Sequence, residues 1–137
     1  MGGHIEHANI SVSDLDAGVR FFQTAFPEWR IRGSASGDTV RWAHLGTDDA
    51  YVCINGPVDP ASVKADRQSG YGFNHIGFIA DDVKGLRQRM LDAGYRDGYS
   101  PEYHEFRTRV YILDNDGIEY EFVEYHSDDP AERNQHS

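Results

Sequence analysis

The chain repeats itself weakly at a spacing of 68 residues, and this internal repeat constrains the fold more than any other feature of the sequence. When residues 1–56 are laid over residues 69–124, polar strand positions fall on polar strand positions and expected helix starts fall on helix starts. The matching pairs are His7 with His75, Asp14 with Asp82, Leu15 with Val83, Phe22 with Met90, Arg41 with Arg109, Leu45 with Leu113, Asp48 with Asp116, and Cys53 with Glu121. A duplicated unit related by a pseudo-twofold axis would bring two histidines, a carboxylate and a thiol to one point, which is the composition of a metal site.

Each half of the repeat has the pattern of a βαβββ unit. The first half predicts a strand at 4–12, a helix from the N-cap Asp14 to about 26, and strands at 29–31, 39–45 and 51–54, with turns at 33–37 and 46–49. The second half predicts a strand at 73–80, a helix at 83–93 between Asp82 and Gly94, strands at 95–96, 107–113 and 118–125, and a last turn at 115–117. We expect one α+β domain of two βαβββ modules forming a cupped mixed β-sheet, with the helices on its outer face. Its parts are module 1 at about 4–56, a linker at 57–71, module 2 at about 72–126 and a flexible tail at 127–137.

Composition limits the partners and the compartment. The chain has 137 residues, a formal net charge of −10 and a single cysteine. The negative charge argues against nucleic acid or an anionic membrane as a partner, because both bind basic patches. No apolar run approaches the roughly 20 residues that cross a bilayer, and a lone cysteine cannot form an internal disulfide. We therefore expect a cytoplasmic protein with a small-molecule partner.

Alternation along the last strands separates the side chains that pack under the helices from those that face the cavity of the cup. Tyr120 and Phe122 share the bulky apolar face, so the opposite face, with Glu121, is left for the cavity. In the preceding strand the apolar positions take the helix side. The cavity side of that strand then carries Arg107, Arg109 and Tyr111.

The shift of 68 carries these assignments to the first half of the chain. Arg41 and Ala43 are then expected to face the cavity, while Trp42 and His44 face away from it. By this argument His44 is a poor ligand candidate, although it is a histidine in the middle of a strand.

His7, His75 and Glu121 remain as the candidate metal ligands. Two neutral imidazoles and one carboxylate form a facial triad, which leaves up to three positions for water, oxygen or substrate and suits Fe(II), Mn(II) or another divalent ion. The alternative is a pair of hydrogen-bonded strand histidines and a surface carboxylate.

Four further residues each have two interpretations. Cys53 takes the fourth symmetric position, either as a soft thiolate ligand or as a small buried hydrophobe. Arg41, Arg107 and Arg109 either hold an anionic substrate through bidentate hydrogen bonds or pair with acidic neighbours.

Three stretches match a known family: residues 7–15 (HANISVSDL), 74–78 (NHIGF) and 114–121 (DNDGIEYE). Over about residues 4–126 the chain resembles the vicinal oxygen chelate superfamily of glyoxalase I, bleomycin resistance proteins, fosfomycin resistance enzymes and extradiol dioxygenases. The resemblance implies that His7, His75 and Glu121 bind the metal, and that the metal chelates two neighbouring oxygens of a small substrate.

The C-terminal stretch resembles the signature of extradiol ring-cleaving dioxygenases. The matching residues are His104, Val110, Tyr111, Asp114, Gly117 and Glu121, with Asn115 where the signature has proline. This resemblance implies an Fe2+ enzyme in which Tyr111 hydrogen-bonds the bound substrate oxygen and His104 assists. It is the leading expectation for the reaction.

Two alternatives follow from the same superfamily. A glyoxalase I-like lyase or isomerase, with Ni2+, Zn2+ or Co2+, would have Cys53 where that enzyme has a fourth carboxylate- or amide-type ligand, so that Glu121 alone would serve as base. Fosfomycin enzymes carry a substrate-holding threonine where this chain has Asn9.

The other alternative is a non-catalytic small-ligand-binding protein that acts in resistance or sensing. The family also implies a homodimer, with each cup built from one chain or from two.

Overall fold

The computed structural model describes residues 5–59, 75–133 and 135. The chain divides into two compact units, Met1–Ser69 and Gly70–Ser137, and each is described separately. Most of the predicted linker and the first two residues of the strand expected at 73–80 lie outside the described residues. The prediction of a single domain stays a prediction, whereas the α+β class and the βαβββ order of both halves are confirmed.

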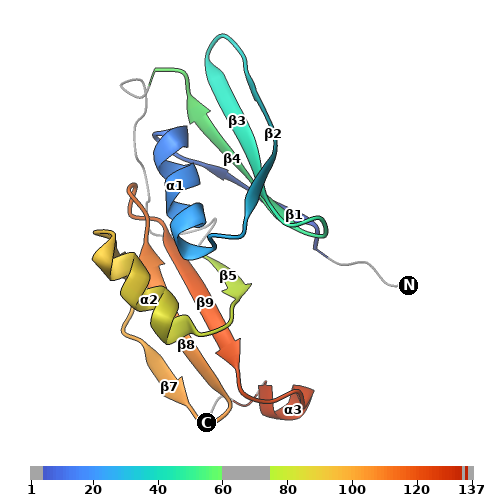
Figure 1. Ribbon diagram of the computed structural model, residues 1–137, viewed down its shortest axis with the longest axis vertical. Helices are drawn as coiled ribbons and strands as arrows, with labels where there is room; N and C mark the ends of the chain where they lie inside the picture. Colours follow the sequence, from blue (N-terminus) through green and yellow to red (C-terminus); the bar gives the residue numbers. More distant parts are fainter. Residues whose placement is uncertain (1–4, 60–74, 134, 136–137) are drawn as a thin grey trace, which may run out of the picture. The chain divides into compact units, whose positions relative to one another are not determined.

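The first unit is a four-stranded mixed sheet with one helix packed on it (Figure 1). Its elements are β1 (His7–Ser11), α1 (Leu15–Ala25), β2 (Arg30–Ser36), β3 (Val40–Gly46) and β4 (Tyr51–Pro57). The strand order is β1-β4-β3-β2, in which β1 runs parallel to β4 and the other pairs are antiparallel. The prediction of a turn at 33–37 is wrong for most of that segment, because β2 continues through a bulge between Ile31 and Gly33 to Ser36.

Helix α1 forms where the sequence predicted it. The Asp14 carboxylate accepts hydrogen bonds from the backbone N–H groups of Asp16 (3.1 Å) and Ala17 (3.4 Å), as an N-cap does. The buried stripe of the helix ends just before Pro27, which cannot continue it. Gly18 permits a close approach to the sheet, since a Cβ there would lie 3.3 Å from Ile54 Cγ2.

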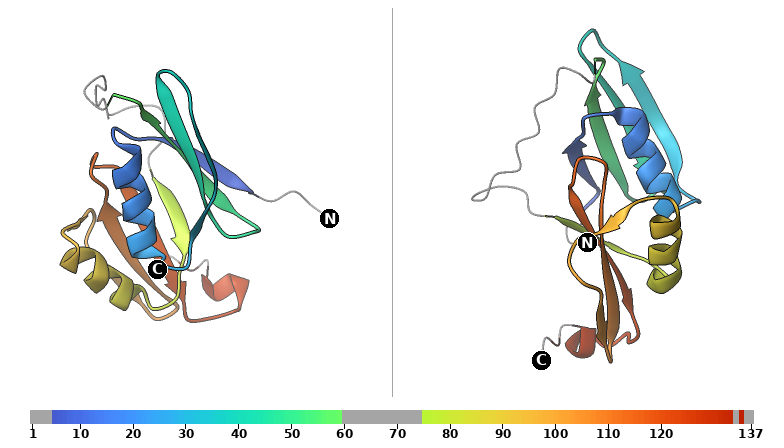
Figure 2. Two further views of the ribbon diagram at one scale, coloured as in Figure 1. Left: turned by 45° about the horizontal axis from the view of Figure 1, so that its top comes forward. Right: turned by 90° about the vertical axis from the view of Figure 1, so that its left-hand side faces the viewer.

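The second unit repeats this plan and adds two short elements (Figure 2). Its elements are β5 (Ile76–Ile79), α2 (Val83–Asp92), β6 (Arg96–Asp97), β7 (Glu102–His104), β8 (Arg107–Leu113), β9 (Glu119–Tyr125) and α3 (Pro130–Arg133). The strand order is β5-β9-β8-β6, and β7 also pairs with β8. Neither β7 nor α3 was predicted. The flexibility of the tail stays a prediction, but four of its residues form α3.

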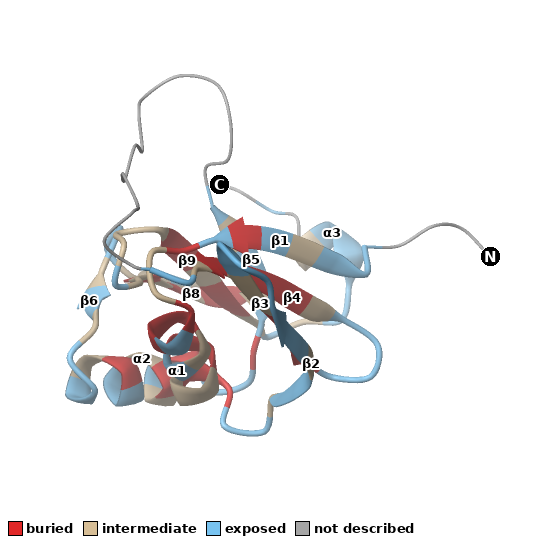
Figure 3. Cartoon of the chain, turned by 90° about the horizontal axis from the view of Figure 1, so that it is seen from above, coloured by how far each residue is buried: buried red, intermediate tan, exposed pale blue. Residues whose placement is uncertain are grey.

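The predicted packing face of the second unit is confirmed. Tyr120 and Phe122 of β9 are fully buried, as are Val110 and Ile112 of β8, and Leu86 and Met90 supply the buried side of α2. Figure 3 shows β1 as largely exposed and β9 as largely buried. No helix among the described residues is long and apolar enough to cross a membrane.

The two long hairpins differ in length by one residue, and this difference overturns one prediction. Four residues (47–50) join β3 to β4, whereas five residues (114–118) join β8 to β9. His44 therefore lies opposite Cys53, while Tyr111 lies opposite Glu121, so β3 matches β8 at a shift of 67 and not 68. A one-residue shift moves every side chain of a strand to the other face.

The predicted facing of β3 is consequently wrong. Ala43 is 2% exposed and pairs with Ile54, which packs under Gly18 of α1. Arg41 lies on the same side, with its Nη2 3.4 Å from the Asp16 carboxylate. Trp42 and His44 lie on the opposite side. We call the sheet face opposite the helix of each unit the open face.

Candidate metal centre

The open face of the second unit brings His75 and Glu121 together. Glu121 lies in β9, and its strand neighbours are Gly77 in β5 and Tyr111 in β8. His75 immediately precedes β5, and its Nε2 atom is 3.6 Å from Glu121 Oε1. A Cβ at Gly77 would lie 3.4 Å from Glu121 Oε2, so the glycine leaves the carboxylate room to stand above the sheet.

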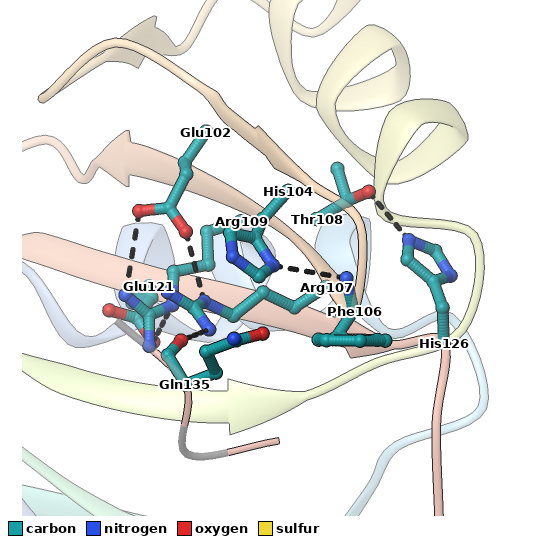
Figure 4. Close-up of polar contacts among 9 residues, drawn as sticks. All are labelled: Glu102, His104, Phe106, Arg107, Thr108, Arg109, Glu121, His126 and Gln135. Carbon is teal, nitrogen blue, oxygen red and sulfur yellow. Dashed lines mark hydrogen bonds and ion pairs between the residues drawn. The ribbon is translucent and has the colours of Figure 1, made fainter. Parts of the chain in front are cut away.

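Arg109 lies beside this pair. Its Nε is 3.8 Å from Glu121 Oε2, and its Nη1 is 3.6 Å from Glu102 Oε2. Dashed lines mark both contacts in Figure 4. The Nε–H group is buried and has no hydrogen-bond partner among the described residues. Burial lowers the pKa of Arg109, but the carboxylates of Glu121 and Glu102 outweigh this effect and the net shift is upward. The guanidinium is therefore a fixed positive charge with an unused donor.

Tyr111 supplies a hydroxyl to the same face. Its ring makes edge-on contacts with His75 (centroids 6.4 Å apart) and Tyr99 (5.8 Å). Burial, reinforced by the negative charge of Glu121, raises the pKa of Tyr111. The phenol thus stays protonated at neutral pH and can donate a hydrogen bond.

The open face of the first unit carries His7 at the start of β1. The ring stacks on Tyr51, with centroids 4.8 Å apart and an interplanar angle of 13°. Its Nδ1 atom donates to Glu6 Oε1 at 2.8 Å. This hydrogen bond is the largest cause of a lowered pKa for Glu6.

Asn9 and Cys53 are strand neighbours on this face. Asn9 Oδ1 accepts a hydrogen bond from the side-chain amide of Asn55. Cys53 is 7% exposed, and burial raises the pKa of its thiol. The neutral, buried side chain fits the hydrophobe interpretation better than the ligand interpretation.

His44, which the shift of 68 placed away from the cavity, shares the open face with His7. Its ring lies between Trp42 and Tyr51, with centroids 4.6 Å from each. The shorter first hairpin is the signal that could have predicted the face on which His44 lies.

The two other predicted arginines also have acidic partners. Arg41 faces α1 and pairs with Asp16. Arg107 is 3% exposed; its Nε donates to Glu102 Oε1 at 2.9 Å and its Nη1 donates to the Gln135 carbonyl (Figure 4). Of the three arginines, Arg109 is the one positioned beside the candidate ligands.

His104 lies in β7, the short strand that pairs with β8. Its Nδ1 accepts a hydrogen bond from the backbone N–H of Phe106 at 3.0 Å. It lies opposite Arg107, four residues from Tyr111 along β8, which corresponds to about 13 Å at the usual rise of a strand. The structure therefore does not bring His104 to Tyr111.

Residues 4–122 match the family model described as the Glyoxalase/Bleomycin resistance protein/Dioxygenase superfamily. The chain belongs to this superfamily. No curated protein matches the sequence at a significant level.

Solved structures of glyoxalase-superfamily proteins share the fold at low sequence identity. A domain from Frankia sp. EAN1pec, described as glyoxylase/bleomycin resistance protein/dioxygenase, has a TM-score of 0.76 at 19% identity and covers 94% of this chain and 96% of its own. Glyoxalase I from Leishmania major has 0.71 at 20% identity, with 90% and 87% covered. The fosfomycin resistance protein FosX from Listeria monocytogenes, solved with Mn(II) and sulfate, has 0.69 at 18% identity, with 98% and 100% covered.

The chemistry of the residues fits a divalent ion in this superfamily member. Neighbouring ligand atoms around an ion with bonds of about 2.1 Å lie roughly 3 Å apart, so the 3.6 Å between His75 Nε2 and Glu121 Oε1 needs only a small movement. Neither unit by itself gathers three His, Cys, Asp or Glu side chains close enough to hold a metal, within the ranges that the structure describes.

Proposed function

We propose that the chain is a divalent-metal-dependent enzyme that binds a small substrate through two neighbouring oxygen atoms. The proposed ligands are His7, His75 and Glu121. The observation that carries the proposal is the approach of His75 Nε2 to Glu121 Oε1 at 3.6 Å on an open sheet face, in the stretches 74–78 and 114–121 that resemble the superfamily. Fe2+ is the leading metal, with Mn2+, Ni2+, Zn2+ and Co2+ as alternatives.

Two further residues of the chain have proposed roles around the substrate. A divalent ion, when bound, supplies Lewis-acid stabilisation of negative charge on the substrate oxygens. Tyr111, with its raised pKa, would donate a hydrogen bond to one of these oxygens. Arg109, whose guanidinium lies beside Glu121, would bind an anionic group of the substrate.

The leading reaction is extradiol-type ring cleavage of a catechol. It is supported by Tyr111 beside Glu121 and His75. The test is oxygen uptake by the Fe2+-loaded protein with a panel of catechols. Oxygen uptake that falls in Tyr111→Phe while iron affinity is unchanged supports the role of Tyr111. No oxygen uptake with iron bound rules out ring cleavage.

A glyoxalase I-like lyase or isomerase reaction is the second candidate. It is favoured by the separation of His104 from Tyr111, because the extradiol resemblance assigns both residues to one substrate. Glu121 would act as the base, since the buried thiol of Cys53 keeps its proton. Metal analysis of the purified protein separates the candidates: iron favours ring cleavage, and nickel, zinc or cobalt favours proton transfer. No metal under any condition favours a non-catalytic binding protein.

The proposed ligand set is tested by metal affinity. Changing a second-shell group typically costs 10–100-fold, so Glu121→Gln, which removes a ligand charge, is expected to weaken Mn2+ affinity by more than about 100-fold. Glu105→Gln is the matched control, because Glu105 is an exposed carboxylate between β7 and β8. Full Mn2+ affinity in Glu121→Gln would count against the assignment.

The predicted homodimer and cytoplasmic location belong to the proposal as well. Light scattering on the purified chain measures its oligomeric state.

A further inference from the structure

Glu6 immediately precedes β1 and is fixed against β4 at two points. Its backbone carbonyl accepts the N–H of Tyr51 at 3.0 Å. Its side-chain Oε1 accepts the Tyr51 hydroxyl at 3.4 Å and the Nδ1–H of His7 at 2.8 Å. Tyr51 thus holds the Glu6 carboxylate in place while the carboxylate accepts the hydrogen bond from His7.

Glu6 and Tyr51 together orient the His7 ring. His7 and Tyr51 lie side by side in the parallel pairing of β1 with β4, and their rings stack. The guanidinium of Arg32 lies 4.3 Å from the centre of the Tyr51 ring, which adds a further contact to this stack. Stacking sets the plane of the imidazole, and the Glu6 hydrogen bond selects which nitrogen points toward the carboxylate.

This arrangement determines where the ring proton lies. An ionised carboxylate only accepts hydrogen bonds, so Nδ1 of His7 must carry the proton. In the neutral ring Nε2 then holds the lone pair, which is what a metal requires of an imidazole. A hydrogen bond from the other ring nitrogen to a carboxylate is the usual way in which proteins orient a histidine ligand.

We infer that Glu6 is a positioning residue, which holds His7 in the Nδ1–H tautomer and presents its Nε2 atom to the metal. The inference rests on the proposed function, in which His7 is a ligand, and adds a residue outside the stretches 7–15, 74–78 and 114–121. The competing explanation is an ordinary surface pair, since the His7 and Glu6 side chains are 43% and 60% exposed and exposed pairs contribute little to stability.

The first experiment needs neither metal nor activity. Nitrogen-15 NMR of the imidazole ring in the metal-free protein, at a pH where the ring is neutral, distinguishes the two tautomers. We expect the Nδ1–H form in the wild type and a shift toward the Nε2–H form in Glu6→Ala. Glu6→Gln keeps an acceptor oxygen and is expected to restore the wild-type signature.

The second experiment measures Mn2+ affinity in the full chain. Glu6→Ala is expected to weaken binding about tenfold, the lower end for a supporting carboxylate because Glu6 is exposed, and Glu6→Gln should recover most of it. Glu28→Ala is the matched control, because it removes one exposed carboxylate of the same unit. Circular dichroism checks that each variant folds.

The results separate the inference from the function on which it rests. An unchanged tautomer in Glu6→Ala would overturn the inference, as would an equal loss of Mn2+ affinity in Glu28→Ala. If the wild type binds neither Mn2+ nor Fe2+, the proposed function fails, while the NMR comparison still decides whether Glu6 controls His7.

Discussion

Asp114 organises the turn that aligns β8 with β9, and its replacement tests how much of the second unit depends on one carboxylate. Its Oδ1 accepts hydrogen bonds from the backbone N–H groups of Asp116 (2.8 Å) and Ile118 (2.9 Å). Its Oδ2 accepts the hydroxyl of Tyr120 at 3.2 Å, and Tyr120 is fully buried. The turn closes with Gly117 at a φ of 77°, in the left-handed region that favours glycine.

Asp114→Ala removes an acceptor from three hydrogen bonds at once. A hydrogen bond to a charged group contributes roughly 1.5–3 kcal/mol, but bonds that share one acceptor are not additive, so we expect a loss of about 3 kcal/mol in the free energy of unfolding. Urea denaturation followed by circular dichroism measures this loss as a lower midpoint at an unchanged m-value. A loss below about 1 kcal/mol would contradict this expectation, since it would mean that water or a neighbour replaces the carboxylate.

Asp114→Asn tests the charge separately, because an amide keeps an acceptor oxygen but does not ionise. Burial raises the pKa of Asp114, although hydrogen bonds from Ile118 and Asp116 oppose the shift. A raised folded-state pKa means that protonation of Asp114 adds stability, and this added part is fully present below the ordinary pKa of about 3.9. It is lost as the pH rises through the folded-state pKa. The stability of the wild type relative to Asp114→Asn should therefore fall with rising pH across this window, and an increase would contradict the burial argument.

Three further perturbations test the packing of the chain. Arg107→Ala should lower the free energy of unfolding by about 2 kcal/mol and speed proteolysis of the C-terminal segment, because Arg107 links Glu102 to the Gln135 carbonyl; equal proteolysis rates would argue against that link. Leu45→Ala should cost about 3 kcal/mol in chemical denaturation, since Leu45 is fully buried, and a cost under 1 kcal/mol would mean that the site collapses. Cys53 should react slowly with a thiol reagent at pH 8 and rapidly after unfolding, because burial raises its pKa; fast labelling of the folded protein would contradict this.

The order of the elements and the faces of the second unit could be predicted from the sequence. The caps Asp14 and Asp82 and the alternation of Tyr120 and Phe122 with Glu121 are local signals, and the structure contains each of them. Local patterns of this kind are sufficient because a cap or a two-residue period depends on neighbours in the chain. The family followed in the same way from short motifs, and the superfamily match confirmed it.

The facing of Arg41 and His44 and the position of His104 were decided by tertiary structure. Because the first hairpin is one residue shorter than the second, the side chains of β3 lie on the opposite faces from those predicted. His104 lies in β7, away from Tyr111. Neither result follows from residue types, because the face of a strand depends on its register with a partner, and that register is fixed by turn length and by hydrogen bonds between distant segments. The contact of His75 with Glu121 depends in the same way on the parallel pairing of β5 with β9, whose strands are separated in the sequence by α2 and three other strands.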